Sequence, residues 1–191
     1  LRLLHDYEGT IRRIETEVFR SLTVSGKEVY VGRAFGKDVT VVVCGVRKLN
    51  AALGAQLAVS KLDAEKLFNF GVAGGLNKRT ALAGVYQIEK AVQFDFDLSQ
   101  LNGTKVGTLD EYKENYLKLN TFKAPFEKRK LGTADRFNDS TEDFSLLTGE
   151  LKADIRDMEG AAVVQAAYAA QLPAYAVKAI SDVAGSGSTT E

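Results

Sequence analysis

The segment from residue 39 to residue 71 constrains the fold more than any other part of the chain. It begins with Val39–Cys44, a continuously apolar run that is typical of a strand buried on both faces. Asn50–Leu62 follows, rich in Ala and Leu at helical spacing, and predicts a helix packed tightly on a sheet. Lys66–Gly71 is then a second strand. A strand, a helix and a strand in succession predict a parallel sheet covered by helices.

The rest of the chain continues this alternation. Glycines in short polar turns at residues 25–27 and 36–38 predict that residues 18–44 form three strands in hairpin succession. Further strands are expected at Val85–Ala91, Val92–Phe96, Lys128–Thr133 and Tyr175–Ile180, and helices at Leu1–Asp6, Asp110–Leu119 and Met158–Gln171. We therefore expect an α/β fold with a mixed, mostly parallel central sheet flanked by helices.

Length and composition exclude several classes of protein. The 191 residues, 45% of them apolar, predict a single domain spanning residues 1–191 with a substantial core. Lys+Arg and Asp+Glu are both 25, so charge gives no reason to expect nucleic acid or a membrane as partner. One cysteine, Cys44, fits a reducing cytoplasm. With His5 as the one histidine, we expect no metal site and give His5 a surface or packing role.

Polar or glycine-rich segments follow several predicted strands, at the ends where open α/β sheets bind ligands. These segments are Gly45–Lys48, Gly71–Gly75, Thr133–Asp139 and Ser181–Asp182. Taken alone, each has a plain structural reading, such as a tight turn for the glycines or a core position for Phe137. Their shared position at strand ends is more informative than any one of them and predicts a ligand site there.

Two acids in this part of the chain have ordinary explanations as well as chemical ones. Glu159 opens a small-residue helix, where the helix dipole favours a carboxylate. Asp182 follows an apolar strand and would be a turn or N-cap aspartate. An acid in that position is costly to bury without a partner, which makes Asp182 a candidate for function.

Three stretches together resemble a known family. Phe70–Gly75, Ile155–Ala162 and Tyr175–Ala184 are similar to the purine nucleoside phosphorylase and nucleosidase superfamily, and most like its 5′-methylthioadenosine/S-adenosylhomocysteine nucleosidases. The resemblance covers roughly residues 28–97 and 131–184. It implies hydrolysis of the N-glycosidic bond of an adenine thionucleoside without metal or organic cofactor. It also implies a role in methionine salvage and assembly as a homodimer or larger oligomer.

On the base side of the site, the resemblance assigns three residues. Asp182 is expected to protonate, or share a proton with, N7 of the purine, because the leaving base is poor as an anion. Ser181 would orient this carboxyl group. Phe137 matches the position whose ring stacks on the base.

On the sugar side, the resemblance assigns Glu159 to the ribose hydroxyls, for which an ionised carboxylate is a suitable acceptor. Met158 would pack against the sugar, with Asp157 as a neighbour behind it. The loop beneath ribose and base is formed by Val72, Ala73 and Gly74. Family members often carry a hydroxyl residue where Val72 stands, and a smaller residue where Arg136 stands.

The ends of the chain depart from the family pattern. The family begins with a strand and a loop that bears a water-activating glutamate. A gap-free register places Glu8 there, but the better local match makes Leu1–Asp6 the helix after that loop. We therefore expect the usual N-terminal strand, the water-activating glutamate and the C-terminal helix to be absent from these residues.

Alternative functions remain open from the sequence. A phosphate-dependent purine nucleoside phosphorylase needs several convergent cationic donors, and Arg47 and Arg136 are the candidates near strand ends. A hydrolase for another purine nucleoside, such as a futalosine-like compound, is a further alternative. The departure at Val72 would also fit a non-catalytic nucleoside-binding homologue.

Overall fold

A computed structural model describes residues 2–4, 16–34, 36–123, 125–137 and 140–184. Within these ranges the elements in chain order are β1 (Arg2–Leu4), β2 (Thr16–Val24), β3 (Lys27–Ala34), β4 (Lys37–Val43), α2 (Lys48–Lys61), β5 (Leu67–Gly75), β6 (Val85–Gln93), α3 (Ser99–Asn102), β7 (Leu117–Lys118), β8 (Lys128–Thr133), α4 (Thr141–Ser145), the π-helix η1 (Leu146–Glu150), β9 (Ile155–Asp157), α5 (Gly160–Ala169) and β10 (Ala174–Val183). Among these residues, no helix is long and apolar enough to cross a bilayer.

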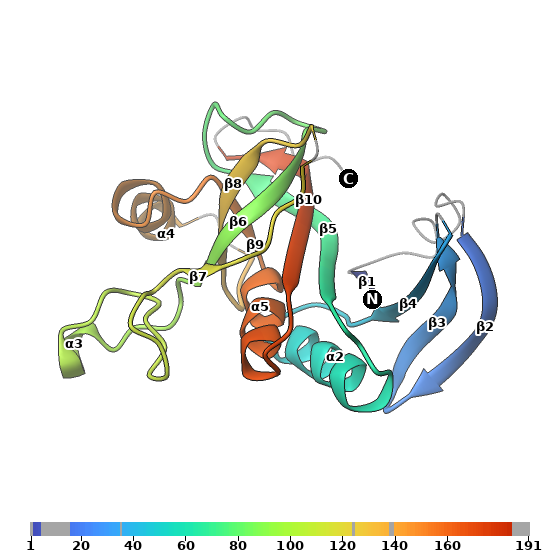
Figure 1. The fold of residues 1–191 in the computed structure, drawn as a ribbon. Coiled ribbons are helices and arrows are strands. Elements are labelled where there is room, and N and C mark those ends of the chain that lie inside the picture. The colour runs from blue at the N-terminus through green and yellow to red at the C-terminus, as the bar shows by residue number, and fades with distance from the viewer. Residues whose placement is uncertain (1, 5–15, 35, 124, 138–139, 185–191) are drawn as a thin grey trace.

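The described strands form one ten-stranded sheet in the order β10-β6-β8-β9-β5-β1-β4-β3-β2, with β7 paired to β6. The pairs β4–β1, β1–β5, β5–β10, β6–β8 and β8–β9 are parallel. Because β10 pairs with both β5 and β6, one half of the sheet closes into a ring of β5, β10, β6, β8 and β9. The hairpins β2–β3–β4 extend away from this ring as a curved wing (Figure 1).

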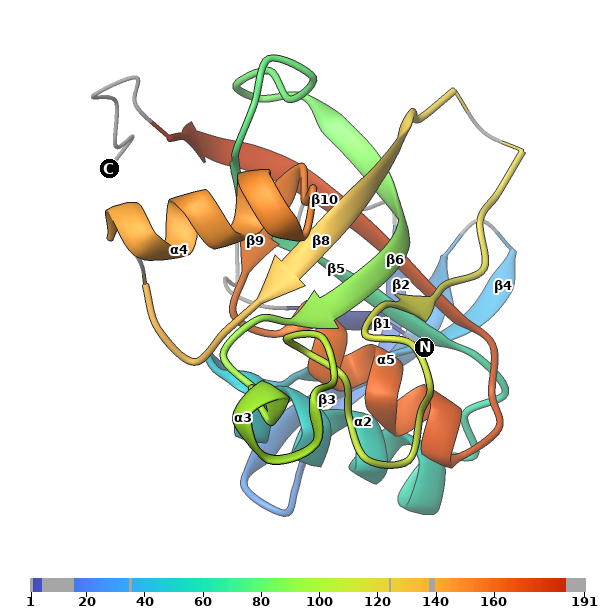
Figure 2. The ribbon, with the colours of Figure 1, turned by 90° about the vertical axis from the view of Figure 1, so that its left-hand side faces the viewer.

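Helices α2 and α5 lie side by side against one side of the sheet in both views (Figures 1 and 2). Small side chains allow this close packing, since Ala51, Ala55 and Ala58 of α2 are completely buried. They share an apolar cluster with Val163 and Ala167 of α5 and with residues of β3, β4 and β5. Burial of this kind contributes about 25 cal/mol for each Å² of apolar surface removed from water.

The structure confirms the α/β fold class and most of the predicted elements. The helix expected at Asn50–Leu62 is α2, and the two strands expected over residues 85–96 are the single strand β6. The helix expected at Met158–Gln171 is the shorter α5, and β10 extends the strand expected at Tyr175–Ile180. Adjacent side chains Val41 and Val42 of β4 are both buried, as its apolar run predicted.

The helix predicted at Asp110–Leu119 is wrong. This segment consists of turns that end in the short strand β7. Two separate contacts hold this segment in place. The ring centres of Tyr112 and Tyr168 lie 5.5 Å apart in an edge-to-face arrangement, and the Tyr116 hydroxyl donates to the Leu151 carbonyl at 3.1 Å. Scattered anchors of this kind do not supply the apolar stripe that stabilises a surface helix.

The helix predicted at Leu1–Asp6 is also wrong over its described part. Arg2–Leu4 forms β1, which lies between β4 and β5 and is parallel to both. Pairing on two sides supplies hydrogen bonds that outweigh the local helical pattern of such a short segment. Glu8 and His5 lie outside the described residues.

Candidate active site

Strand register brings the candidate segments together at the carboxyl ends of β5 and β10. Asp182 of β10 is the registered partner of Gly74 of β5, after a bulge between Ile180 and Asp182. Gly74 in turn faces Arg156 of the neighbouring strand β9. On the other side of β9, Asp157 is paired with Thr133 at the end of β8. Residues far apart in the sequence therefore lie around one point.

A pocket of about 150 Å³ opens at this point. The residues that the resemblance assigned to the site all line it: Val72, Ala73, Gly74, Phe137, Asp157, Met158, Glu159, Ser181 and Asp182. Of the four strand-end segments, Gly45–Lys48 contributes no lining residue. Phe94, Arg136 and Arg156 complete the lining. The pocket is mainly apolar, with carboxylates and guanidinium groups set into its wall, a composition common in sites for small organic ligands.

The Asp182 carboxylate is held on both oxygens. The Ser181 hydroxyl donates to Oδ1 at 2.9 Å, and Nη2 of Arg156 lies 3.5 Å from Oδ2. The side chains of Asp182 and Arg156 are 19% and 15% exposed, so a ligand in the pocket can still reach them. Gly74 leaves room for this pair, because a Cβ there would lie 3.0 Å from Oδ2 and 2.9 Å from Nε of Arg156.

Glu159 occupies the N-cap position of α5, where its side chain makes no capping hydrogen bond, and it is only 2% exposed. The backbone N–H of Arg47 donates to its Oε1 at 3.0 Å. Arg47 makes this contact with φ 85° and ψ 156°, a backbone region that is strained for a residue with a side chain. The dipole of α5 and the Arg47 amide together stabilise a negative charge at this place.

Asp157 has the contacts of a structural residue. Its side chain is 1% exposed and forms a 2.7 Å ion pair with Lys178, which is completely buried. The Thr133 hydroxyl donates to Oδ1 of Asp157 at 2.6 Å, and the Gly160 amide donates at 2.9 Å to Oδ2, the oxygen that is paired with Lys178. This network joins β8, β9, β10 and α5 directly beneath the pocket and fixes the backbone of Met158 and Glu159.

The apolar lining is the most open part of the site. Phe137 is 70% exposed and Val72 is 52% exposed, so both offer uncovered surface to a ligand. The guanidinium carbon of Arg156 lies 5.8 Å from the centre of the Phe137 ring. An aromatic face with this exposure is suited to stacking on a flat heterocycle.

Two cations near the strand ends already have carboxylate partners. Lys48 forms a 2.6 Å ion pair with Asp95, and both side chains are largely buried. Arg136 makes two hydrogen bonds to Asp143, at 2.7 and 2.8 Å, and this contact raises the pKa of the guanidinium. The charge of each group is therefore already compensated in part by a carboxylate.

Sequence reasoning missed Arg156 and Phe94 as lining residues. Arg156 belongs to β9, a strand of three residues that is too short to be recognised from an apolar pattern. Without the strand, the direction of the Arg156 side chain could not be predicted. Phe94 directly follows β6 and is 3% exposed, as a core residue would be. Arg156 lies next to Asp157, which the sequence did single out, and this is the one signal that points to it.

No group of three or more His, Cys, Asp and Glu side chains within the described ranges is arranged to hold a metal ion. Cys44 is buried, and loss of hydration raises the pKa of its thiol to about 11, with the charge of Glu159 as a second cause. A neutral, buried thiol is a packing group rather than a nucleophile or metal ligand.

Comparison with known proteins gives consistent matches. A family model described as the phosphorylase superfamily matches residues 2–191. A 5′-methylthioadenosine/S-adenosylhomocysteine nucleosidase from Marinomonas sp. (strain MWYL1) is 32% identical over 181 residues, which are 87% of this chain and 77% of that protein. A nucleosidase of the same name from Listeria monocytogenes serotype 4a (strain HCC23) is 29% identical, covering 88% of this chain and 78% of its own.

Solved structures share the fold. The 5′-methylthioadenosine/S-adenosyl homocysteine nucleosidase of Campylobacter jejuni superposes with a TM-score of 0.85 at 19% identity, covering 100% of this chain and 88% of its own. Futalosine hydrolase of Helicobacter pylori strain 26695 superposes with a TM-score of 0.84 at 20% identity, covering 95% and 83%. At these identities the likeness concerns the fold.

Proposed function

This chain belongs to the phosphorylase superfamily, and within it we propose that the chain hydrolyses the N-glycosidic bond of an adenine thionucleoside such as 5′-methylthioadenosine or S-adenosylhomocysteine. The relatives at 32% and 29% identity bear the name of this activity. The observation that carries the proposal is the pairing, in one pocket, of a Ser181-supported Asp182 with a Glu159 fixed at a helix N-terminus.

The base is handled by Asp182, Ser181 and Phe137. The purine stacks on the exposed Phe137 ring, and its N7 meets the Asp182 carboxyl group. Ser181 and Arg156 fix the direction of that group through their contacts at 2.9 and 3.5 Å. A proton passed to or shared with N7 lets the base leave without a full negative charge, and general acid help of this kind contributes about 10²–10⁴-fold in rate.

The sugar is handled by Glu159 and Met158. The Glu159 carboxylate accepts hydrogen bonds from ribose hydroxyls, and Met158 packs against the sugar ring at the same side of the pocket. Val72, Ala73 and Gly74 line the same pocket. As the C–N bond breaks, C1′ becomes an oxocarbenium-like centre that a water molecule attacks.

Phosphorolysis is the alternative within the same superfamily. A phosphate pocket needs converging donors that are not already used, as Arg-rich anion sites show. Of the two candidate donors, Arg136 is paired with Asp143 and Arg47 does not line the pocket. The other guanidinium group in the lining, that of Arg156, is paired with Asp182. These contacts favour water as the nucleophile over phosphate.

Cellular context follows from the proposed reaction. We place the protein in the cytoplasm, in methionine salvage, as a homodimer. The support is the family and the single free thiol Cys44, which a reducing compartment preserves.

The test is the release of adenine from 5′-methylthioadenosine with and without inorganic phosphate, with identification of the sugar product. We expect release at the same rate in both conditions, with a free reducing sugar. Release that requires phosphate and yields a sugar 1-phosphate would make the protein a phosphorylase. No release of adenine, with retained binding of the nucleoside, would make it a binding protein.

A further inference from the structure

A row of lysines crosses three neighbouring strands on the part of the sheet that does not carry the active site. Lys90 of β6 is the registered partner of Lys118 of β7 on one side and of Lys130 of β8 on the other. Like charges placed directly opposite each other across strands are destabilising. The three neighbouring positive charges therefore lower the stability of the fold unless a negatively charged group lies near them.

The period of the strands shows that this row faces away from the core. The next row along the same strands consists of Ala91, Leu117 and Leu131, which are at most 5% exposed and belong to one apolar cluster. Because successive side chains point to opposite faces, the lysine row lies on the other face. Lys90 and Lys130 are half-buried there, and Lys118 is exposed.

Within the described ranges, no carboxylate forms an ion pair with Lys90, Lys118 or Lys130. The contact that Lys90 makes is with an aromatic ring: its Nζ lies 4.9 Å from the centre of Tyr116. Tyr116 is fixed in turn by its hydrogen bond to the Leu151 carbonyl. The ammonium group of Lys90 is thus held against an aromatic ring rather than in an ion pair.

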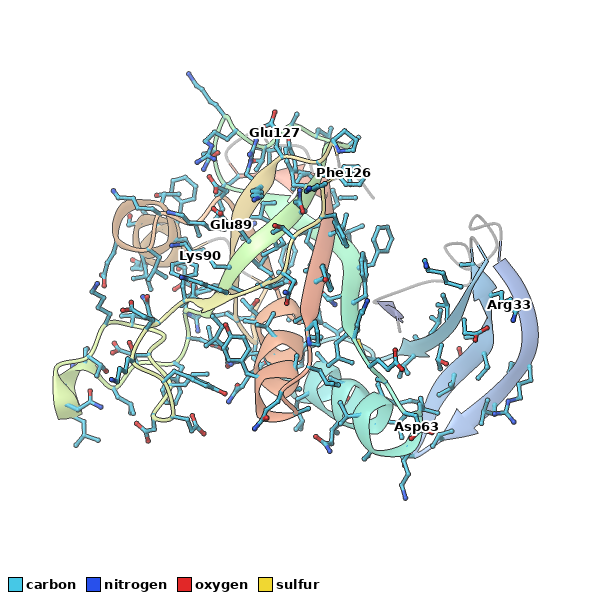
Figure 3. All side chains as sticks on the ribbon, in the orientation of Figure 1. Arg33, Asp63, Glu89, Lys90, Phe126 and Glu127 are labelled. Carbon is cyan, nitrogen blue, oxygen red and sulfur yellow. The ribbon has the colours of Figure 1, made fainter. Side chains whose placement is uncertain are left out.

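The same three lysines line two adjoining hollows of about 470 and 310 Å³. Lys105 lies in the first and Lys128 in the second, so five ammonium groups surround the surface. In Figure 2, β6 and β8 face the viewer, with α4 to the left of β8 and the loop that carries α3 below; Lys90 is labelled in Figure 3. These volumes match those of sites for small molecules.

We propose that this lysine row and its hollows bind a compact, multiply charged phosphate compound, such as a nucleotide polyphosphate or pyrophosphate. Ammonium groups bind phosphate oxygens through charge-assisted hydrogen bonds. Glu114 and Glu150 line the first hollow and Glu89 lines the second, so the five lysines outnumber the carboxylates by two. This excess of positive charge attracts a small anion of high charge. This site is independent of the proposed nucleosidase reaction.

The test is a calorimetric titration of the protein with inorganic pyrophosphate at low ionic strength, where surface charges are least screened. Lys90→Gln and Lys130→Gln are each expected to weaken binding about ten-fold or more, since each removes a charged hydrogen bond to the ligand. The matched control is Lys37→Gln, an exposed lysine of β4 at the far side of the sheet, which is expected to leave binding unchanged. Far-UV circular dichroism checks that each variant is folded.

Two outcomes of the titration would overturn the proposal. One is the absence of saturable binding, or an equal loss in the control variant, which would mean non-specific attraction. The other is displacement of pyrophosphate by a single-stranded oligonucleotide whose affinity grows with its length. That result would make the face a nucleic-acid surface instead.

A second measurement does not need the ligand. Lys118→Gln is expected to raise the midpoint of thermal unfolding by about 1–4 °C in the absence of anions, because it removes one like-charge neighbour from the row. Pyrophosphate is expected to raise the midpoint of the unmodified protein by about 3–6 °C at ten times its dissociation constant. A lower midpoint in Lys118→Gln would mean that the row is already balanced within the protein, which contradicts the reason for a ligand.

Discussion

At the scale of single residues, the pocket contains side chains that are exposed to a ligand and side chains that are buried and stabilise the surrounding backbone. Phe137 is 70% exposed, whereas the side chain of Asp157 is 1% exposed and fully engaged by its neighbours. The sequence placed both in the site, but it does not contain the information that separates these roles. Exposure and partners depend on which strands become neighbours, and that is decided by the tertiary fold.

Phe137→Ala is expected to weaken nucleoside binding without destabilising the protein. The exposed ring contributes little to the core, whereas stacking on a base contributes about 1–3 kcal/mol, which corresponds to roughly 5–150-fold in KM. Steady-state kinetics and thermal unfolding measure the two effects. Phe126→Ala is the matched control, because Phe126 is 38% exposed on the loop before β8, and it should leave KM unchanged. An unchanged KM in Phe137→Ala would remove this residue from the base site.

Lys178→Met is expected to lower the free energy of unfolding by about 3–5 kcal/mol. The substitution leaves the Asp157 carboxylate buried without its 2.7 Å partner, and an uncompensated buried charge is costly. Denaturant unfolding measures the change, with Lys66→Met on an exposed position as control. Adding Asp157→Asn to Lys178→Met should recover part of the loss. A double variant less stable than Lys178→Met alone would contradict the account.

At the scale of elements, the shortest strands are the ones that could not be predicted from the sequence. The long elements α2, β6 and β10 have enough apolar pattern to be recognised, whereas β1 and β9 have three residues each. Such short strands are defined by the partners on both sides and not by their own composition. For this reason the sequence analysis did not predict that Arg156 lines the pocket, and it assigned Arg2–Leu4 to a helix instead of a strand.

Arg47→Gly is expected to stabilise the protein by roughly 1 kcal/mol. Arg47 begins α2 with φ 85° and ψ 156°, a conformation that glycine adopts easily and that costs other residues about 1–3 kcal/mol. The contact from its backbone N–H to Glu159 is kept in the variant. Arg47→Ala serves as control, since it removes the side chain but leaves the strain. Equal stability of the glycine and alanine variants would show that the backbone is not strained.

Glu8→Gln is expected to lower the rate of hydrolysis by about 10²-fold or more while substrate binding persists. The strand β1 runs parallel to β5 and is therefore directed toward the end of β5 that carries the pocket. The variant tests the gap-free register, which gives the water-activating role to Glu8, a residue outside the described ranges. Glu65→Gln, at an exposed position after α2, is the control. Full activity in Glu8→Gln would assign water activation to another group.

At the scale of the whole molecule, the fold places its chemistry where the parallel strands β5 and β10 end beside the antiparallel strand β9. The alternation of strands and helices predicted the α/β class, and the strand-end segments predicted which side chains would meet. The closure of β10 onto both β5 and β6 was beyond the sequence, because it depends on long-range pairing. That closure sets Asp182 against Gly74 and Arg156, and so creates the pocket.

The measurement that tests the account most directly is the rate of adenine release from 5′-methylthioadenosine by the unmodified protein, Asp182→Asn and Asp63→Asn. Asp63 is exposed at the end of α2 in Figure 3, and its φ of 49° is one that asparagine tolerates well, so this variant is the matched control. We predict that kcat falls by about 10²–10⁴-fold in Asp182→Asn and is unchanged in Asp63→Asn. Release at the full rate by Asp182→Asn would contradict the central claim that Asp182 assists departure of the base.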